Sequence, residues 1–317
     1  MDLSYNADPS LPTRDADFLA LDDALANLPN LKALNLAFNQ LGATSSASLD
    51  QLMGSIGNLK SLLLLNISHN ALGDNGASSA TQALGEALQN LQHLQFLDLS
   101  YNQLGAPSVE NLSYPGTTAV LQGISKLGRL EYISLQGNSL GSAGSADLAR
   151  TLGDMLRRLP SVLHLDISDN GLGKGSLEEE TAIVDGLVYG KPNLCSLRIQ
   201  GNRFGSHSPL APRKIIDFLT RVTEFQIGDM PVSWSSSVTQ MNAIIAKSLR
   251  ERCENTMCYG KHFKGFVKRR CVVHSPVTPG AVISLESTQA EQTVEIYPTF
   301  FSQPTTPAWN LDGEDKL

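Results

Sequence analysis

The stretch LDLSYNQLG, residues 97–105, decides how the rest of the chain is interpreted, because near-copies of it recur. The copies are LNLAFNQLG (34–42), LNISHNALG (65–73), ISLQGNSLG (133–141), LDISDNGLG (165–173) and LRIQGNRFG (197–205). Successive asparagines in these phrases, from Asn39 to Asn202, are 31, 32, 36, 32 and 32 residues apart. Similarity at a fixed period of this size indicates a protein built from stacked structural repeats.

The chain also begins with a piece of this phrase, DLSYN at residues 2–6, and its Asn6 precedes Asn39 by 33 residues. Residues 2–6 match the strand end of a repeat whose first half is missing. We expect either a fragment of a longer protein or a gene that starts on a bare half-repeat. In both cases the first strand would be an exposed sheet edge without a capping segment.

The third copy shows the order of features within one repeat. Leu97 and Leu99 alternate with other residues, as in a strand with one buried face. We expect Asn102 to turn inward and bond backbone groups that would otherwise be buried unpaired. We expect the closing Gly105 to supply a turn with positive φ. The six phrases therefore predict strands at residues 34–36, 65–67, 97–99, 133–135, 165–167 and 197–199.

Between the phrases, the apolar spacing changes from two residues to three and four, which is typical of helices. It is seen in Leu49, Leu52, Met53 and Ile56, in Ala80, Ala83, Leu84, Ala87 and Leu88, and in Leu148, Leu152, Met155 and Leu156. Each repeat is thus strand, turn, helix. One such unit cannot bury its apolar faces alone, so stacking must supply the core.

The pattern L-x-x-L-x-L-x-x-N-x-L-G followed by a helix resembles the ribonuclease-inhibitor type of leucine-rich repeat, over roughly residues 1–230. The resemblance implies an α/β fold: a right-handed solenoid, or horseshoe, with a parallel concave sheet and convex helices. The repeat length and the pairs Leu28-Pro29 and Leu159-Pro160 are similar to those of leucine-rich repeat effectors of intracellular bacterial pathogens. That similarity implies a protein secreted into a host cytosol to act on a host protein.

Downstream of the repeats the sequence changes character. Residues 225–227 resemble one more strand, residues 231–252 read as a C-terminal capping helix, and residues 253–317 form an extension. Within the extension, β-prone runs at 266–274, 281–285 and 293–297 predict a small antiparallel sheet before a loose tail. The one lengthened repeat carries Pro107 and Pro115, which predicts a projecting loop near residues 106–118.

Composition limits the partners and the compartment. A net charge of −7 and a pI of about 5.4 argue against nucleic acid as the main partner. No signal peptide and no transmembrane-length apolar run is visible in the sequence. The four cysteines, with Cys195 isolated from the others, do not have the spacing of a disulfide framework. We therefore expect a reducing cytosol, in the producing cell or in a host.

Three motifs suggest chemistry, and each has a simpler interpretation. Residues 137–141 match the G-x-S-x-G nucleophile elbow, but the repeat itself generates this match at Ser139. The spacing of Cys253, Cys258, His262, Cys271 and His274 fits no tight zinc template, so we expect a capping segment and leave zinc as the alternative. The run YGKHFKGFVKRR (259–270) suits acidic lipid or nucleic acid, or more simply a solvated strand edge.

Strand alternation predicts which side chains leave the buried face. Four rows of positions, starting at Ala33, Asn35, Ala37 and Phe38, should point from the concave sheet to solvent. Aromatics beside charges are typical of interface hot spots, although Tyr and Phe also merely suit strands. The predicted partner-binding residues are Phe38, His69, Phe96, Asp98, Tyr101, Tyr132, His164, Asp166, Asp169 and Arg198.

The sequence therefore favours a non-catalytic scaffold that binds a partner protein on its concave face. It shows no catalytic triad, P-loop or metal motif, and we expect no cofactor and no small-molecule substrate. The alternative is a regulator of an enzyme such as a small GTPase, since Ran GTPase-activating proteins share the repeat type, or of a ubiquitin-pathway component. A ubiquitin ligase itself is disfavoured, because only about 65 residues follow the expected cap.

Overall fold

The computed structural model describes residues 1–6, 15–43, 45–73, 78–105, 114–141, 145–189, 191, 193–208, 210–219, 222, 224–226, 283–285 and 292–294. One parallel sheet runs through it, made of β1 (Ala33–Asn35), β2 (Leu64–Asn66), β3 (Phe96–Asp98), β4 (Tyr132–Ser134), β5 (His164–Asp166), β6 (Ser196–Arg198) and β7 (Glu224–Gln226). The helices are α1 (Asp15–Ala26), α2 (Ser46–Asn58), α3 (Ser78–Asn90), α4 (Pro115–Ile124), α5 (Ala146–Arg157), α6 (Leu177–Val188) and α7 (Leu210–Leu219). A short 3-10 helix, η1, lies at Leu41–Ala43.

The sheet confirms the predicted repeat architecture. The strands follow one another in the order β1 to β7, and every neighbouring pair is parallel. Equivalent residues are in register, as in Leu34, Leu65 and Leu97. Each of the six predicted strands begins one residue earlier than expected, and β7 confirms the additional strand expected near residues 225–227.

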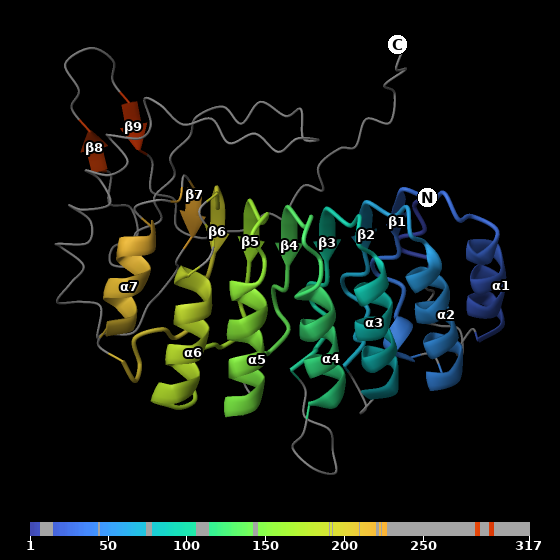
Figure 1. Ribbon diagram of the computed structural model, residues 1–317, viewed down its shortest axis with the longest axis horizontal. Helices are drawn as coiled ribbons and strands as arrows, with labels where there is room; N and C mark the ends of the chain where they lie inside the picture. The colour runs from blue at the N-terminus through green and yellow to red at the C-terminus, as the bar shows by residue number, and fades with distance from the viewer. Residues whose placement is uncertain are drawn as a thin grey trace.

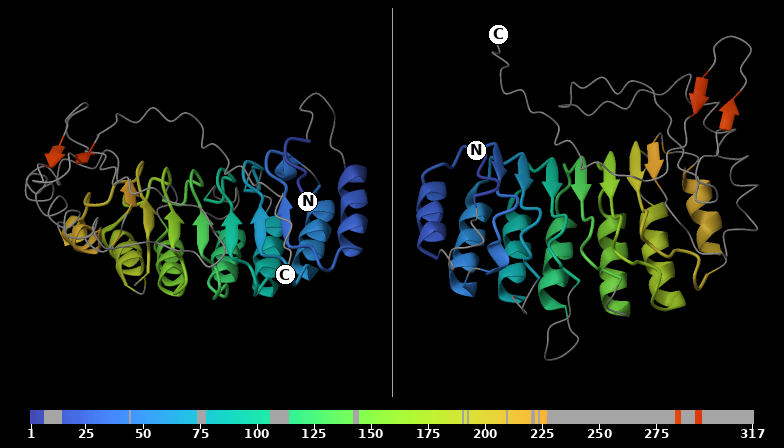
Figure 2. Two further views of the ribbon diagram at one scale, coloured as in Figure 1. Left: turned by 90° about the horizontal axis from the view of Figure 1, so that it is seen from above. Right: turned by 180° about the vertical axis from the view of Figure 1, so that it is seen from behind.

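The strands form one layer and the helices lie side by side in a second (Figures 1 and 2). Leucine and isoleucine from the strands meet the apolar stripes of the helices between the layers, in one continuous core. Serines begin several helices: the hydroxyls of Ser45, Ser145 and Ser176 accept bonds from the backbone N–H three residues on, at 3.4, 3.3 and 3.3 Å.

Neighbouring helices touch closely at glycine. A Cβ atom on Gly123 would lie 2.4 Å from the carbonyl oxygen of Gly85, and one on Gly186 would lie 2.2 Å from that of Gly153. A larger residue at these positions would push the helices apart.

The half-repeat at residues 2–6 stacks on the first full repeat. Asp2 forms a parallel bridge with Asn35, and Leu3 N–H donates to the carbonyl of Asn35 at 2.8 Å. The N–H of Asn6 donates to Oδ1 of Asn39 at 2.9 Å. This fragment of the phrase thus occupies the place that the phrase occupies in a full repeat.

A ladder of buried asparagine side chains joins the repeats, as the sequence predicted. Asn102 is fully buried; its Nδ2 donates to the carbonyls of Leu99 (3.1 Å) in its own repeat and Ile67 (2.8 Å) in the preceding one. Its Oδ1 accepts from the N–H of Asn70 at 3.1 Å. The same pattern recurs at Asn39, Asn70, Asn138 and Asn170.

The expected reason for the closing glycines is wrong for most of them. Positive φ is found at Gly173 and Gly205, but not at Gly42, Gly73, Gly105 or Gly141. These four are glycine because the next repeat approaches too closely for a side chain. A Cβ atom on Gly105, for example, would lie 2.3 Å from the backbone oxygen of Ser139.

Other expectations are corrected or fall outside the described residues. The predicted loop at 106–118 is too long, since α4 already begins at Pro115, and proline suits the first turn of a helix.

Cys195 is disulfide-bonded, which spacing along the chain could not show because pairing depends on proximity in space. Strand β8 (Ile283–Leu285) pairs antiparallel with β9 (Gln292–Val294); β8 lies within the predicted run 281–285, and β9 overlaps the start of the predicted run 293–297. The expected cap at 231–252, the cysteine–histidine cluster and the basic run at 259–270 lie outside the described residues.

Replacement of Asn102 by alanine should lower the free energy of unfolding by roughly 1–3 kcal/mol, because it leaves buried backbone groups of two repeats unpaired. Gln103→Ala is the matched control: Gln103 is exposed, and Ala71 already occupies its place in the preceding repeat with the same left-handed φ. Thermal melts followed by circular dichroism measure both. Equal losses for the two variants would contradict the ladder's role.

Gly105→Ala should destabilise the protein by about 1–3 kcal/mol, because the added methyl group overlaps the backbone of the next repeat. Gly54→Ala, within α2, is the control. Nothing lies within 4 Å of a Cβ atom there, and alanine is the better helix former by about 1 kcal/mol. The two Gly→Ala changes are therefore expected to shift the melting temperature in opposite directions, and a shift of the same sign would refute the close-approach explanation.

Candidate functional site

Two stacked rings lie at the centre of the concave sheet. Phe96 on β3 and Tyr132 on β4 face each other across the register, with ring centroids 4.3 Å apart and planes 6° apart. His164 on β5 follows, its centroid 6.3 Å from that of Tyr132 and its ring tilted by 37°. The residue that follows each ring in its strand is a buried leucine or isoleucine. Because side chains alternate along a strand, the three rings lie on the sheet face opposite the core. We call Phe96 and Tyr132 the central aromatic pair.

Two carboxylates lie two residues further along the chain, at the ends of β3 and β5. Oδ1 of Asp98 accepts from the N–H and hydroxyl of Ser100, at 2.9 and 2.7 Å. Asp166 makes the same two bonds with Ser168, at 3.0 and 2.5 Å. In the first two repeats Asn35 and Asn66 bond the equivalent N–H groups. An amide therefore suffices for the turn, and the negative charges are additional to it.

The environment of these carboxylates disfavours their charged forms. Burial raises the pKa of Asp98, and the charge of Asp166 raises it further. Burial also raises the pKa of Asp166, while the Arg198 guanidinium, 3.7 Å away, opposes this shift. Burial and the charges of both carboxylates raise the pKa of the Tyr132 hydroxyl. The aromatic pair and the two acids therefore share one negative electrostatic environment.

A second column of rings follows the turns just after the strands. Tyr5, Phe38, His69 and Tyr101 stack in succession, with centroids 4.2, 4.0 and 4.4 Å apart and planes inclined by 12°, 11° and 22°. We call these four side chains the rim ladder. Its end members are exposed, Tyr5 by 68% and Tyr101 by 41%. Tyr5 was missed in the sequence prediction, although its place in the partial phrase DLSYN aligns it with the other three.

The rim ladder stops where the column changes residue type. The next position is Gly137, and a Cβ atom there would lie 2.6 Å from two carbons of the Tyr101 ring. The following position is Asp169, which is exposed and whose Oδ2 accepts from Nε2 of Gln136 at 2.9 Å. Burial raises the pKa of Tyr101, with the charge of Asp169 as the next cause, so the ring and the carboxylate interact.

The structure thus divides the ten predicted residues into two groups rather than one patch. Phe96, Tyr132 and His164 lie over the strands together with Asp98, Asp166 and Arg198, whereas Phe38, His69, Tyr101 and Asp169 follow the rim. One predicted row is not a solvent-facing row. Ser68, Ser100 and Ser168 in it are buried, because the strands end before them and their hydroxyl or backbone groups bond the preceding side chain.

The nucleophile-elbow match is explained by the repeat. Asn138 belongs to the buried ladder, and Gly141 N–H donates to the carbonyl of Asn170 at 2.9 Å. The pattern around Ser139 therefore follows from stacking.

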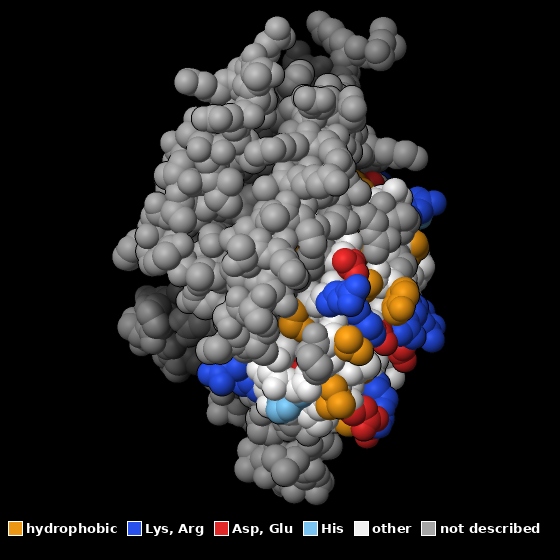
Figure 3. Space-filling model, turned by 90° about the vertical axis from the view of Figure 1, so that its left-hand side faces the viewer, with side chains coloured by type: hydrophobic (Ala, Val, Ile, Leu, Met, Phe, Trp, Pro, Cys, Tyr) orange, Lys and Arg blue, Asp and Glu red, His pale blue; other side chains and the backbone are white. Residues whose placement is uncertain are grey.

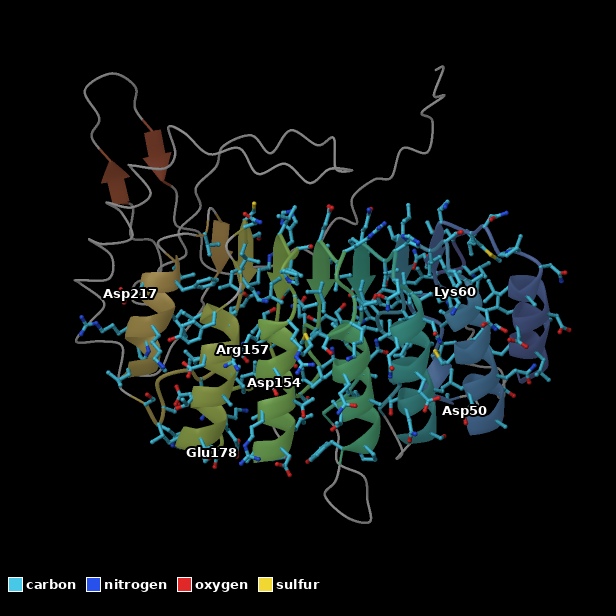
Figure 4. The ribbon with its side chains drawn as sticks, in the orientation of Figure 1. Asp50, Lys60, Asp154, Arg157, Glu178 and Asp217 are labelled. Carbon is cyan, nitrogen blue, oxygen red and sulfur yellow. The ribbon has the colours of Figure 1, made fainter. Side chains whose placement is uncertain are left out.

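The helix layer handles charge differently from the concave sheet. Arg150 on α5 bonds Asp147 on its own helix and Glu178 on α6, both at 2.5 Å, and Lys214 on α7 bonds Asp185 at 2.6 Å. Figure 4 shows Asp154 and Arg157 together on α5, 3.7 Å apart. From the α7 end, Figure 3 shows acidic, basic and hydrophobic side chains interspersed. Four acids on the helices thus have basic neighbours within 4 Å, whereas no ion pair is found for Asp98 or Asp169 within the described residues.

Asp98→Asn should preserve the turn, because Asn66 makes the equivalent bond to Ser68 N–H at 3.0 Å. Folding raises the pKa of Asp98 above its ordinary value of 3.8. Ionisation of Asp98 is therefore easier in the unfolded chain, and the wild-type protein loses stability as pH rises from 3.8 through the raised pKa. We expect a higher melting temperature than wild type at pH 7, with the difference approaching zero at about pH 3. The control Asp23→Asn removes one charge from an exposed position of α1. A gain that persists or grows on acidification would contradict this assignment.

Comparison with known proteins agrees with these repeats. A family model described as Leucine Rich repeat matches residues 27–45, 58–79 and 90–113. Among solved structures, the leucine-rich repeat-containing protein LegL7 from Legionella pneumophila is 21% identical, with a TM-score of 0.44, covering 75% of this chain and 68% of that one. The tropomodulin C-terminal domain from Caenorhabditis elegans is 13% identical, with a TM-score of 0.37, covering 52% and 90%. Among the described helices, none is both long and apolar enough to cross a bilayer. The matched segments are leucine-rich repeats, and the in-register parallel sheet and the asparagine ladder continue the same architecture through the other described repeats.

Proposed function

We propose that this protein is a non-catalytic recognition scaffold that binds a partner protein on its concave face. Leucine-rich repeat domains generally bind proteins, and the proposal specifies the surface that binds. The observation that carries it is the central aromatic pair with Asp98 and Asp166 beside it. The core leucines explain the stacking of the repeats, but nothing in the repeat requires large rings and carboxylates on the opposite face of the sheet.

The physical properties of this surface suit protein recognition. Stacked aromatic rings offer a large, rigid contact area that loses little conformational entropy on binding. Desolvated carboxylates beside them favour a partner that presents a basic group next to an apolar anchor. The repeat length and the Leu-Pro pairs are similar to those of leucine-rich repeat effectors of bacterial pathogens. On this basis the proposed partner is a host-cell protein.

The double variant Phe96→Ala with Tyr132→Ala tests the proposal. Both side chains lie outside the leucine core, so the variant should fold, as circular dichroism will verify. Its affinity for a partner isolated from a host-cell lysate should fall about thirtyfold, corresponding to about 2 kcal/mol for truncating interface anchors. The affinities are measured with purified partner by calorimetry.

The matched control is Tyr189→Ala with Leu177→Ala, which removes two exposed apolar side chains from the two ends of α6, away from the sheet. This variant should bind like wild type. A folded Phe96→Ala, Tyr132→Ala protein with wild-type affinity would exclude the central aromatic pair as the binding site.

A further inference from the structure

The residues of the rim ladder adopt a backbone conformation that their own side chains disfavour. Their φ angles are 58° at Tyr5, 60° at Phe38, 56° at His69 and 56° at Tyr101. The left-handed region is unfavourable for residues that carry a side chain and is the natural place for glycine. Gly137 and Gly201 occupy the same turn in later repeats, at φ 67° and 70°. The turn therefore forms without a ring, and four successive aromatic residues there need another explanation.

Stacking accounts for part of it, because paired aromatic rings attract one another beyond the effect of burying their area. It also makes the rim ladder a rigid column that ends at Tyr101. One face of Tyr101 meets His69, and the ring extends over Gly137, which contributes no side chain. Beyond it stands the Asp169 carboxylate, held by Gln136. The column thus presents, in order, an aromatic ring, a glycine and a fixed negative charge.

The charges around this end are unbalanced. The four rows of positions on the concave sheet contain Asp98, Asp166 and Asp169, but Arg198 is the one lysine or arginine among the described members of these rows. Arg198 approaches Asp166, 3.7 Å away. The charges of all three acids raise the pKa of the Tyr101 hydroxyl, which places the end of the rim ladder within their field. A cation arriving at this point would complement it.

We propose that the end of the rim ladder binds an arginine side chain of the partner protein, its guanidinium stacked on Tyr101 and paired with Asp169. This proposal rests on the proposed function and names the chemistry of the partner. Arginine suits the site better than lysine. Its planar guanidinium stacks on aromatic faces and pairs with a carboxylate through two parallel bonds, whereas an ammonium is a strongly hydrated point charge.

Nuclear magnetic resonance titration of the full chain with the tripeptide acetyl-Gly-Arg-Gly-amide tests the proposal. The control peptide replaces arginine by citrulline, which has the same shape and no charge, and a second peptide carries lysine. We expect shifts centred on Tyr101 and Gly137, and an apparent Kd at least about fivefold lower for the arginine peptide than for the other two.

Protein variants separate the ring from the charge. Asp169→Asn keeps an acceptor for Gln136 and should abolish the preference for arginine over citrulline. Tyr101→Ala should also abolish this preference. Tyr101→Phe should retain it, because phenylalanine keeps the aromatic face. Tyr5→Ala, at the opposite end of the rim ladder, should leave the titration unchanged.

Several results would overturn the assignment. These are equal affinity for the arginine and citrulline peptides, equal or tighter binding of the lysine peptide, or a loss on Tyr5→Ala as large as on Tyr101→Ala. The last would mean that the rim ladder has only a structural role. If partner affinity falls with Phe96→Ala and Tyr132→Ala but not with Asp169→Asn or Tyr101→Ala, this inference fails and the proposed function stands. If the peptide titration succeeds while the central double variant binds normally, recognition belongs to the rim and the proposed central site fails.

Discussion

Buried asparagine amides hold the stack together, and the other features of the structure depend on them. The strands are only three residues long, and some backbone groups beyond them, such as the N–H of Asn70 and the carbonyl of Ile67, are bonded by an asparagine side chain. One side chain such as Asn102 bonds its own repeat and the preceding one. These bonds hold the chain in register just beyond each strand, where the regular pairing of the sheet ends. Consecutive turns therefore superpose, and side chains in equivalent turn positions are brought into stacking distance.

The two aromatic columns follow from this superposition. Strand register sets the 4.3 Å separation of Phe96 and Tyr132, and turn register sets the 4.0–4.4 Å separations along the rim ladder. The same register also aligns charged side chains. On the concave face it sets Asp98 and Asp166 two repeats apart at equivalent positions, and their pKa values rise because burial removes water that would solvate them. A repeat protein can thus build a recognition surface by varying residues that its own stacking does not use.

The sequence predicted the parallel sheet, the helix layer and the inward asparagines because these arise from periodic burial, which periodic residues reveal. The sequence-based predictions failed where the role of a residue depends on its contact with a residue far away in the chain. Gly105 is needed because Ser139 approaches it, and nothing in the spacing of either residue shows that contact. Sequence likewise could not show that Ser100 and Ser168 bend back onto the preceding carboxylates. At the candidate site, alternation found the rings, but the division into a central pair and a rim ladder required the turn geometry.

The close contacts of Gly85 with Gly123 and of Gly153 with Gly186 have a consequence for curvature. Solenoids of this kind bend because packed helices are usually about 8–10 Å apart while strands are about 4.8 Å apart. Glycine at helix contacts reduces that difference, which favours a more open arc. An open arc offers its inner surface to a broad, gently convex object rather than enclosing a narrow one, and small residues on the outer layer thereby set the shape that the inner layer can accommodate.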